Sequence, residues 1–333
     1  MSNHDPLPIP HISVIVPAYG VAHLVAEALD SLLAQSLTQW EAIVIDDGAP
    51  DDVAGAVAPY LADPRFRFLA TANHGVATAR NRAIAESRAP LIALLDGDDL
   101  LRPEYLSMMV AAMQEDAGTA IATCNARVFG AVAREDVVVG DDQNRGGTGT
   151  LSDVLERRFN IYIGSTFRRA DFDRIGGFDT TMTNSEDFDL WVRLLMDGGR
   201  VRYLDAVLAD YRVRPGSASV HLLRNIHGNI RVCEKVIAAL PDSHEARVAA
   251  ARRESELERA KVEEALAAVI AGDTRNGLKA LQAQRHYLGN PLWSVAFALW
   301  RIFPGLAPPM LAWRKRRHEG SSRRRPLRTP SGA

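Results

Sequence analysis

The chain has 333 residues, 47% of them apolar, and a formal net charge of -2 at pH 7. This length exceeds one average domain and the apolar content is sufficient for a hydrophobic core, so we expect one large domain with an appendage. The two cysteines, Cys124 and Cys233, lie far apart and outside any CxxC or Cys/His spacing, which excludes a disulfide framework and a zinc site.

The two ends of the chain differ from its interior. Residues 1–10 contain three prolines and no apolar run, so we expect a disordered N-terminus without a secretory signal. Residues 314–333 hold eight Lys and Arg against the single acid Glu319 and are predicted to form a basic, disordered tail. Because no uninterrupted run of about 18 to 20 apolar residues occurs, we expect the protein to be cytoplasmic.

The first 220 residues alternate between strand and helix patterns. Short, continuous apolar runs predict buried strands at 12–16, 42–45, 66–69 and 91–95. Helical spacing or a proline at the first helical position predicts helices at 24–33, 76–86 and 103–114. This order predicts an α/β domain over residues 11–220, with a doubly wound, mainly parallel sheet.

The patterns change beyond the fourth strand. Residues 134–150 are rich in Gly, Asp and Asn, which indicates a long mobile loop of the kind that often covers a functional site. A helix is expected at 188–197 and an extended segment at 201–213. Residues 221–313 then read as a separate helical region.

The end of this helical region, residues 292–313, is apolar and aromatic but is interrupted by Arg301 and three prolines. It therefore cannot span a bilayer, and we expect it to lie at a membrane interface together with the basic tail. The alternative is that the segment packs on the catalytic domain as a pair of core helices and that the tail is merely disordered.

Three of the predicted strands end in polar residues, at 17–19, at Asp46-Asp47 and at Asp96-Gly97-Asp98-Asp99. Ligands of open α/β sheets bind beyond the carboxyl ends of the strands, so these residues mark the expected crevice. Two carboxylates separated by one residue can hold a hard cation while pyrophosphate oxygens fill its other positions. The alternative for the acidic motif is a solvated turn.

Seven segments of the chain resemble, in order, the inverting family 2 glycosyltransferases of GT-A fold. They are SVIVPAYG, EAIVIDDGAPDD, NHGVATARNRA, LLDGDDL, RIGGFD, SEDFDLWVRL and YRVRPGSAS, and they cover roughly residues 11–220. The resemblance implies a GT-A domain and a divalent metal, Mn²⁺ or Mg²⁺. It also implies transfer of a sugar from a nucleotide-sugar, a UDP-sugar by default, to a hydroxyl acceptor.

The resemblance assigns the donor site residue by residue. Pro17 and Tyr19 match positions that line the nucleotide base and ribose, although Tyr19 could instead be a core tyrosine at a strand end. Asp47 matches the acid that accepts a hydrogen bond from the base, while Asp46 orders the turn. Asp96 and Asp98 match the metal-binding pair, with Asp98 the closer ligand and Asp96 also near the ribose.

The resemblance places the general base at Asp187, preceded by Glu186, which would contact the acceptor or support the loop. A carboxylate suits this task when burial and nearby charge raise its pKa, because it must take a proton from a sugar hydroxyl. The alternative is that Asp187 only caps the helix that follows.

Arg212 and Arg214 stand where the family often has Y-R-x-H, so Arg214 replaces a histidine. A guanidinium cannot ligate a metal, but it can bind a diphosphate. Both arginines are therefore predicted to contact the donor diphosphate.

The expected partners are a nucleotide-sugar donor, a saccharide, lipid-linked or protein acceptor and an anionic membrane surface, with no nucleic acid. The expected process is synthesis of a cell-surface polysaccharide or glycoconjugate. Two alternatives remain open at this point. A sugar nucleotidyltransferase would need a Gly-rich loop with a basic residue after the first strand, which VPAYGVAH lacks. A catalytically inactive nucleotide-sugar-binding scaffold at the membrane would release no nucleoside diphosphate.

Overall fold

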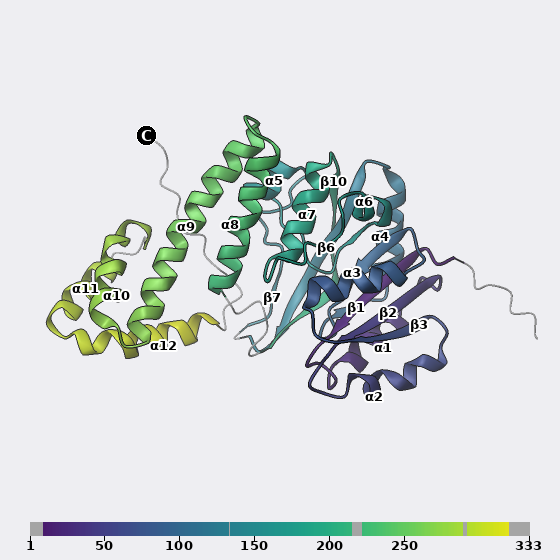
Figure 1. Ribbon diagram of the computed structural model, residues 1–333, viewed down its shortest axis with the longest axis horizontal. Helices are drawn as coiled ribbons and strands as arrows, with labels where there is room; N and C mark the ends of the chain where they lie inside the picture. Colours follow the sequence, from purple (N-terminus) through teal and green to yellow (C-terminus); the bar gives the residue numbers. More distant parts are fainter. Residues whose placement is uncertain (1–8, 133, 215–221, 289–291, 320–333) are drawn as a thin grey trace, which may run out of the picture. The chain divides into compact units, whose positions relative to one another are not determined.

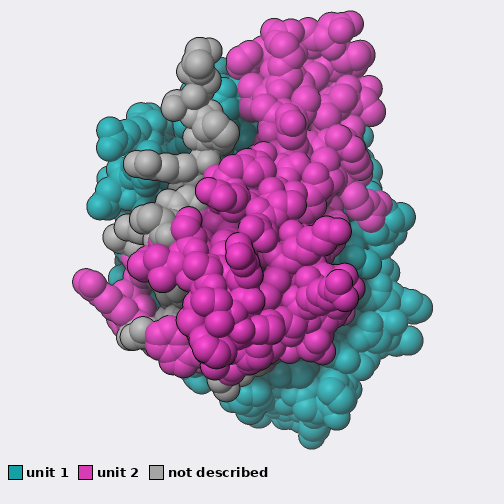
Figure 2. Space-filling model, turned by 90° about the vertical axis from the view of Figure 1, so that its left-hand side faces the viewer, with its two compact units in different colours: residues 1–129, 137–212 teal, residues 130–136, 213–333 magenta. Residues whose placement is uncertain are grey.

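The computed structural model describes residues 9–132, 134–214, 222–288 and 292–319 (Figure 1). The chain forms two compact units, residues 1–129 with 137–212 and residues 130–136 with 213–333, which Figure 2 colours teal and magenta. The unit boundary falls at residue 212, against the predicted 220. The predicted disorder of residues 1–10 falls mostly outside the described residues.

The first unit contains one sheet in the order β3-β2-β1-β4-β9-β6-β10-β5. Its first four strands, β3 (Phe66–Thr71), β2 (Trp40–Asp47), β1 (Ile12–Ala18) and β4 (Leu91–Leu94), are parallel. Antiparallel pairing begins at β9 (Thr166–Arg168), and the remaining strands are β5 (Leu100–Leu101), β6 (Thr119–Gly130), β7 (Asp136–Val137), β8 (Thr148–Gly149) and β10 (Arg200–Val213). The predicted α/β class is confirmed.

The apolar run of β1 explains why this sheet carries helices on both faces. Successive side chains of a strand point to opposite faces. Ile12, Val14 and Val16 join the core cluster that includes α1 (Val25–Leu33), while Ile15 is fully buried outside that cluster. The helix α3 (Val76–Glu86), which has the predicted bounds, packs on β1 and β2. The other helical segments of the unit are α2 (Val53–Val57), η1 (Ala58–Ala62), α4 (Tyr105–Glu115), α5 (Leu151–Leu155), α6 (Arg169–Arg174) and α7 (Glu186–Met196).

The segment predicted as an irregular loop, residues 134–150, contains two short strands. β7 pairs with β6 and β8 pairs with β10. The side chain of Asn125 accepts from the backbone of Val139 at 2.9 Å and donates back to it at 3.0 Å. Asn144 forms the same kind of hydrogen-bond pair with the backbone of Asn160, at 2.7 and 2.9 Å. The prediction of a loop without secondary structure is therefore wrong for the two ends of this segment.

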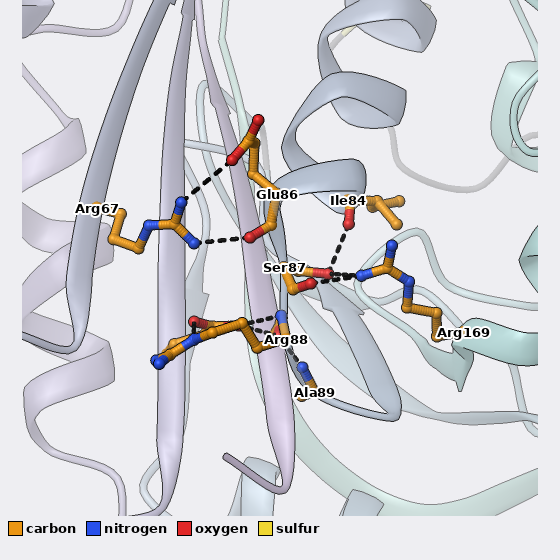
Figure 3. Close-up of polar contacts among 9 residues, drawn as sticks. Arg67, Ile84, Glu86, Ser87, Arg88, Ala89 and Arg169 are labelled. Carbon is orange, nitrogen blue, oxygen red and sulfur yellow. Dashed lines mark hydrogen bonds and ion pairs between the residues drawn. The ribbon is translucent and has the colours of Figure 1, made fainter. Parts of the chain in front are cut away.

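The amino-terminal edge of the sheet is held by a buried carboxylate, Glu41. It accepts hydrogen bonds from the Ser13 hydroxyl at 2.7 Å and from the backbone N–H and the Nε of Arg88 at 2.6 and 2.9 Å. Close by, Arg169 donates to the backbone and the hydroxyl of Ser87 (Figure 3). Burial by itself would raise the pKa of Glu41, but the bonds from Ser13 and Arg88 outweigh it and lower that pKa. This edge is thus a structural one.

Glu41→Gln should lower the free energy of unfolding at pH 7 by about 1 to 3 kcal/mol, because a buried charge-assisted network loses its acceptor. The folded pKa of Glu41 is depressed, so its stabilisation is present above the unfolded value and is lost as the pH falls through the folded value. Denaturant unfolding at pH 7 and pH 3 should show the difference from wild type shrinking at pH 3. Glu86→Gln, in an exposed pair with Arg67, is the matched control and should change stability by less than about 0.5 kcal/mol. A deficit independent of pH would contradict the assignment.

The second unit is helical. α8 (Leu222–Ala239) packs along α9 (His244–Ile270), and α9 also contacts α10 (Thr274–Ala283) and α12 (Ala307–Glu319). Between them lie η3 (Arg285–Tyr287), α11 (Leu292–Ile302) and η4 (Pro304–Leu306). The helix α12 continues to Glu319, so the disorder predicted from Arg314 onward does not begin there, and the rest of the tail lies outside the described residues. Within the described ranges, no helix has both the length and the apolarity needed to cross a bilayer.

Candidate active site

The carboxyl ends of β1 and β4 meet at one edge of the sheet. The two strands are parallel neighbours, and the backbone N–H of Gly97 donates to the carbonyl of Pro17 at 3.3 Å. A Cβ on Gly97 would lie 3.1 Å from that carbonyl oxygen, so the residue between Asp96 and Asp98 has to be small. The structure therefore brings the predicted metal-binding pair next to the predicted base-binding residue Pro17.

Tyr19 lies on the turn that follows β1 and is 53% exposed, so the alternative of a core tyrosine is wrong. This turn is held by Asp51, whose two carboxylate oxygens accept from the backbone N–H groups of Gly20 at 3.1 Å and Ala22 at 2.7 Å. Gly20 has φ +64°, a conformation that favours glycine. No role was predicted for Asp51, although its place in DDGAPDD, after a predicted strand end, was the available signal.

Two acids, Asp46 and Asp47, end β2, and the predicted turn-ordering role of Asp46 agrees with its contacts. Asp46 accepts from the backbone N–H of Ala49 at 2.7 Å and so orders the turn. Asp47 is buried, and its two oxygens accept from the backbone N–H groups of His74 and Gly75, both at 2.9 Å. Asp47 thereby fixes the loop before α3 beside the end of β2. Its contact with a nucleotide base stays a prediction.

Arg80, on α3, is the buried centre of this edge. Its side chain is 3% exposed and donates from Nη2 to Asp96 at 2.7 Å and from Nη1 to Glu186 at 2.8 Å. Burial acts to lower the pKa of Arg80, but Asp96 and Glu186, with Asp187 after them, raise it. The guanidinium therefore stays charged and joins the D-x-D turn to the start of α7.

Arg80 lies within the segment NHGVATARNRA, but no role was predicted for it. The available signal was its spacing, because Arg80 lies three residues after Ala77 and four before Ile84, on the buried stripe of the helix. A charged residue at such a position is rare unless it is paired. Pairing with acids elsewhere in the chain could have been inferred from that stripe.

Asp187 lies in the first turn of α7, which begins at Glu186, and Ser185 occupies the N-cap position in the left-handed conformation with φ +59°. Asp187 is therefore not the N-cap residue of this helix, although its carboxylate accepts from the backbone N–H of Phe188 at 2.7 Å, and its role as general base stays a prediction. Burial and the neighbouring charge of Glu186 raise the pKa of Asp187 to about 6, against the opposing effects of the Phe188 backbone N–H and Arg80. Such a carboxylate is ionised near neutral pH and still basic enough to take a proton.

A pair of glycines, Gly176 and Gly177, lies in the segment between α6 and α7, next to Asn81 of α3. Gly176 and Gly177 have φ of +81° and +75°, and a Cβ on Gly177 would lie 2.9 Å from Oδ1 of Asn81. That oxygen accepts from the backbone N–H of Phe178 at 2.8 Å, and Nδ2 of Asn81 donates to the Phe178 carbonyl at 2.9 Å. The Phe178 ring lies 5.6 Å from the Arg80 guanidinium carbon. Asn81 and Arg80, both on α3, thus position successive parts of this segment.

Arg212 supports the acidic turn from β10. Its Nε donates to the carbonyl of Asp98 at 2.8 Å, its backbone N–H to Asp99 at 2.7 Å, and its Nη2 to Glu27 at 2.7 Å. Asp99 also accepts from the Tyr162 hydroxyl at 3.1 Å. The geometry thus gives Arg212 a positioning role, and its contact with a diphosphate stays a prediction. Arg214 belongs to the second unit, so the structure does not relate it to Asp98.

The donor chemistry of Asp96 and Asp98 fits a hard divalent cation, although no group of three or more His, Cys, Asp or Glu in the described ranges is arranged to hold a metal alone. Burial, and then the charge of Asp96, raise the pKa of Asp99 well above its ordinary value. The charge of Asp98 adds to this rise in pKa, while the hydrogen bonds from the Arg212 backbone and the Tyr162 hydroxyl oppose it. The turn is therefore crowded with negative charge, which a cation would relieve. Two protein carboxylates leave the remaining ligand positions for substrate oxygens and water.

Comparison with known proteins agrees with this geometry. Residues 13–176 match the family model described as glycosyl transferase family 2. The chain is 32% identical over 218 residues to the uncharacterized glycosyltransferase EpsJ of Bacillus subtilis and 32% identical over 222 residues to the succinoglycan biosynthesis protein ExoO of Rhizobium meliloti. Each of these alignments covers 63% of this chain and 63% of the relative. The alignment with the chondroitin synthase of Escherichia coli is 25% identical and covers 56% of this chain but 26% of that protein.

Solved structures share the fold. The S. aureus TarS fragment 1-349 in complex with UDP-GlcNAc has a TM-score of 0.61 at 17% identity, covering 93% of this chain and 90% of that one. The mannosyltransferase PcManGT of Pyrobaculum calidifontis, in complex with GDP-Man and Mn²⁺, has a TM-score of 0.51 at 20% identity, covering 93% and 89%. The family match therefore assigns residues 13–176 to glycosyl transferase family 2, and the solved structures show that the chain shares the fold of these glycosyltransferases.

Proposed function

We propose that this protein transfers a sugar from a nucleotide-sugar, a UDP-sugar by default, to a hydroxyl acceptor with inversion at the anomeric carbon. The observation that carries the proposal is the bridge through Arg80, which holds Asp96 and Glu186 within hydrogen-bond distance of one guanidinium. This bridge joins the turn suited to a diphosphate and cation to the turn that carries Asp187.

The reaction is a single displacement. The acceptor hydroxyl attacks the anomeric carbon, the bond from that carbon to the diphosphate oxygen breaks, and the nucleoside diphosphate leaves. Asp187 takes the proton of the attacking hydroxyl, and its pKa of about 6 keeps it ionised at neutral pH. Glu186 lies beside it and contacts the acceptor or supports the loop.

The donor would lie along the carboxyl edge of β1, β2 and β4. The exposed ring of Tyr19 offers a stacking surface for a base, with Pro17 and Asp47 beside it. The TarS complex with UDP-GlcNAc and the PcManGT complex with GDP-Man support a nucleotide-sugar as donor class. Arg212 and Arg214 are the proposed diphosphate contacts.

Asp98 and Asp96 would hold Mn²⁺ or Mg²⁺, and the Mn²⁺ in the PcManGT complex supports this choice. The cation would supply positive charge where negative charge develops on the leaving diphosphate. The name of ExoO, a succinoglycan biosynthesis protein, supports a role in cell-surface polysaccharide or glycoconjugate synthesis. A cytoplasmic, peripheral position at the plasma membrane, with a saccharide, lipid-linked or protein acceptor, completes the proposal.

The test is a screen of UDP-, GDP- and dTDP-sugars with acceptor extract, with nucleoside diphosphate release measured with and without Mn²⁺ or Mg²⁺. We expect release from one donor that depends on both extract and metal, and that is lost in Asp187→Asn. Release of pyrophosphate from a nucleoside triphosphate and a sugar phosphate would instead identify a nucleotidyltransferase. Donor binding without any release under any condition would identify an inactive scaffold.

Arg80→Gln should slow transfer by about 10²-fold and move the acidic limb of the pH–rate profile upward from about 6, because the positive charge that lowers the pKa of Asp187 is gone. Arg80→Lys keeps the positive charge but cannot form both hydrogen bonds in the same geometry. It should therefore return the acidic limb of the pH–rate profile to the wild-type position and recover only part of the wild-type rate. The pH–rate profiles of the two variants are the measurement. If Arg80→Gln lowers the rate but leaves the acidic limb of the pH–rate profile at the wild-type pH, Arg80 contributes to packing and does not set the pKa of Asp187.

A further inference from the structure

The last helices of the second unit have two different faces. Trp293 and Trp300 of α11, with Ala307 and Leu311 of α12, are buried in a cluster that also contains Val269. This cluster joins the two helices to α9 and α10. Residues 292–313 therefore form the expected helices, but this cluster packs them on α9 and α10 of the second unit and not on the catalytic domain.

The opposite face of the same segment is apolar and exposed. On α11, residues 292, 295 and 302 are three and seven positions apart, which places them on one side of the helix. On α12, residues 310 and 313 are three positions apart and share a side, and Leu306 of η4 is exposed just before this helix begins. The exposed fractions are between 42% and 70% for this set, which is Leu292, Val295, Ile302, Phe303, Leu306, Met310 and Trp313. We call it the α11–α12 face.

The charges within this segment, and in the four residues that follow it in the sequence, have one sign. No Asp or Glu occurs between residues 292 and 313, where Arg301 is exposed at the last turn of α11. Arg314, Lys315, Arg316 and Arg317 follow Trp313 directly, and the backbone of α12 remains helical through them. Cationic residues therefore continue the same helix that presents the apolar side chains.

We infer that the α11–α12 face docks on the surface of an anionic lipid bilayer. An exposed apolar face of this kind marks an interaction site. The adjoining basic run favours a partner with an apolar interior and a negatively charged surface, as an anionic lipid bilayer has. No helix of the described part can span a bilayer, so the contact is interfacial. The inference rests on the proposed function only in that lipid-linked acceptors would be presented on such a surface.

The experiment is co-sedimentation, at low and at physiological salt, of the full chain with sucrose-loaded vesicles of phosphatidylcholine alone or with about 30 mol% phosphatidylglycerol. The salt concentration is varied because salt screens the attraction between exposed charges. We expect strong binding to the anionic vesicles, weak binding to the neutral ones and a decrease with salt. Ile302→Ser with Phe303→Ser should lower partitioning roughly tenfold or more. Arg316→Gln with Arg317→Gln should lower it by roughly 30-fold, as about 1 kcal/mol for each basic residue implies.

The matched control is Leu33→Ser with Leu61→Ser, two exposed apolar side chains of the first unit, which should leave vesicle binding unchanged. The inference is overturned if the full chain stays in the supernatant with anionic vesicles at low salt, or if the Ile302/Phe303 variant binds like wild type. It is also overturned if that variant only abolishes self-association in sedimentation equilibrium, which would assign the face to a second copy. Nucleoside diphosphate release measured without vesicles tests the proposed function separately.

Discussion

Replacing Asp187 with asparagine should reduce sugar transfer by about 10²- to 10⁴-fold while leaving donor and metal binding intact. The amide keeps the shape of the side chain but cannot take the proton of the attacking hydroxyl. The raised pKa of Asp187, due first to burial and then to Glu186, is what makes the carboxylate an effective base near neutral pH. In wild type, kcat/KM should therefore fall as the pH drops below about 6, because the base becomes protonated.

The measurement is the pH profile of transfer for wild type and Asp187→Asn, together with titration calorimetry of the donor nucleotide. The variant should lose the acidic limb and keep the nucleotide affinity. Asp173→Asn, whose exposed side chain pairs with Arg169 on α6, is the control and should behave like wild type. Transfer near the wild-type rate in Asp187→Asn would place the base elsewhere.

The strands and helices nearest the site are predictable because their patterns are local. An almost continuous β-branched run such as that of β1, interrupted by Ser13, favours a strand covered on both faces, and the bounds of α3 follow from Gly75 before it and the spacing of its apolar residues. The antiparallel second half of the sheet was not predicted. β9 has three residues, too short for a period to show, and its place between β4 and β6 is decided by long-range pairing.

The acids of the site were predictable by position, but what holds them was not. Arg80 and Glu186 are 106 residues apart, and no local pattern indicates that their side chains meet. The same applies to Arg212, which the sequence analysis assigned to a diphosphate and which the structure joins to the Asp98 carbonyl and Glu27. Pairings of this kind depend on the packed fold, whereas strand ends are set by the polarity of the sequence itself.

The role of Asp98 can be separated from the stability of its turn. Arg212 holds this turn through the carbonyl of Asp98 and the carboxylate of Asp99, and Gly97 anchors it to Pro17, so alanine at position 98 keeps these bonds. Asp98→Ala should therefore fold normally, with a thermal midpoint close to that of wild type. A large loss of thermal stability would show that the carboxylate is structural.

Asp98→Ala should lower nucleoside diphosphate release by about 10³-fold at any Mn²⁺ concentration, because the cation loses a ligand where charge develops on the leaving diphosphate. Initial rates titrated against Mn²⁺ give the measurement, and the variant should show neither the wild-type maximum nor its midpoint. Asp116→Ala, which removes a half-exposed carboxylate that lies outside the D-x-D turn and pairs with Arg200, is the control and should keep the wild-type metal response. Because Asp96 remains bound to Arg80 in the variant, any residual activity should depend on Asp96. A wild-type response to Mn²⁺ in Asp98→Ala, or full activity of the wild type in the presence of a chelator, would contradict the assignment of the metal to this pair.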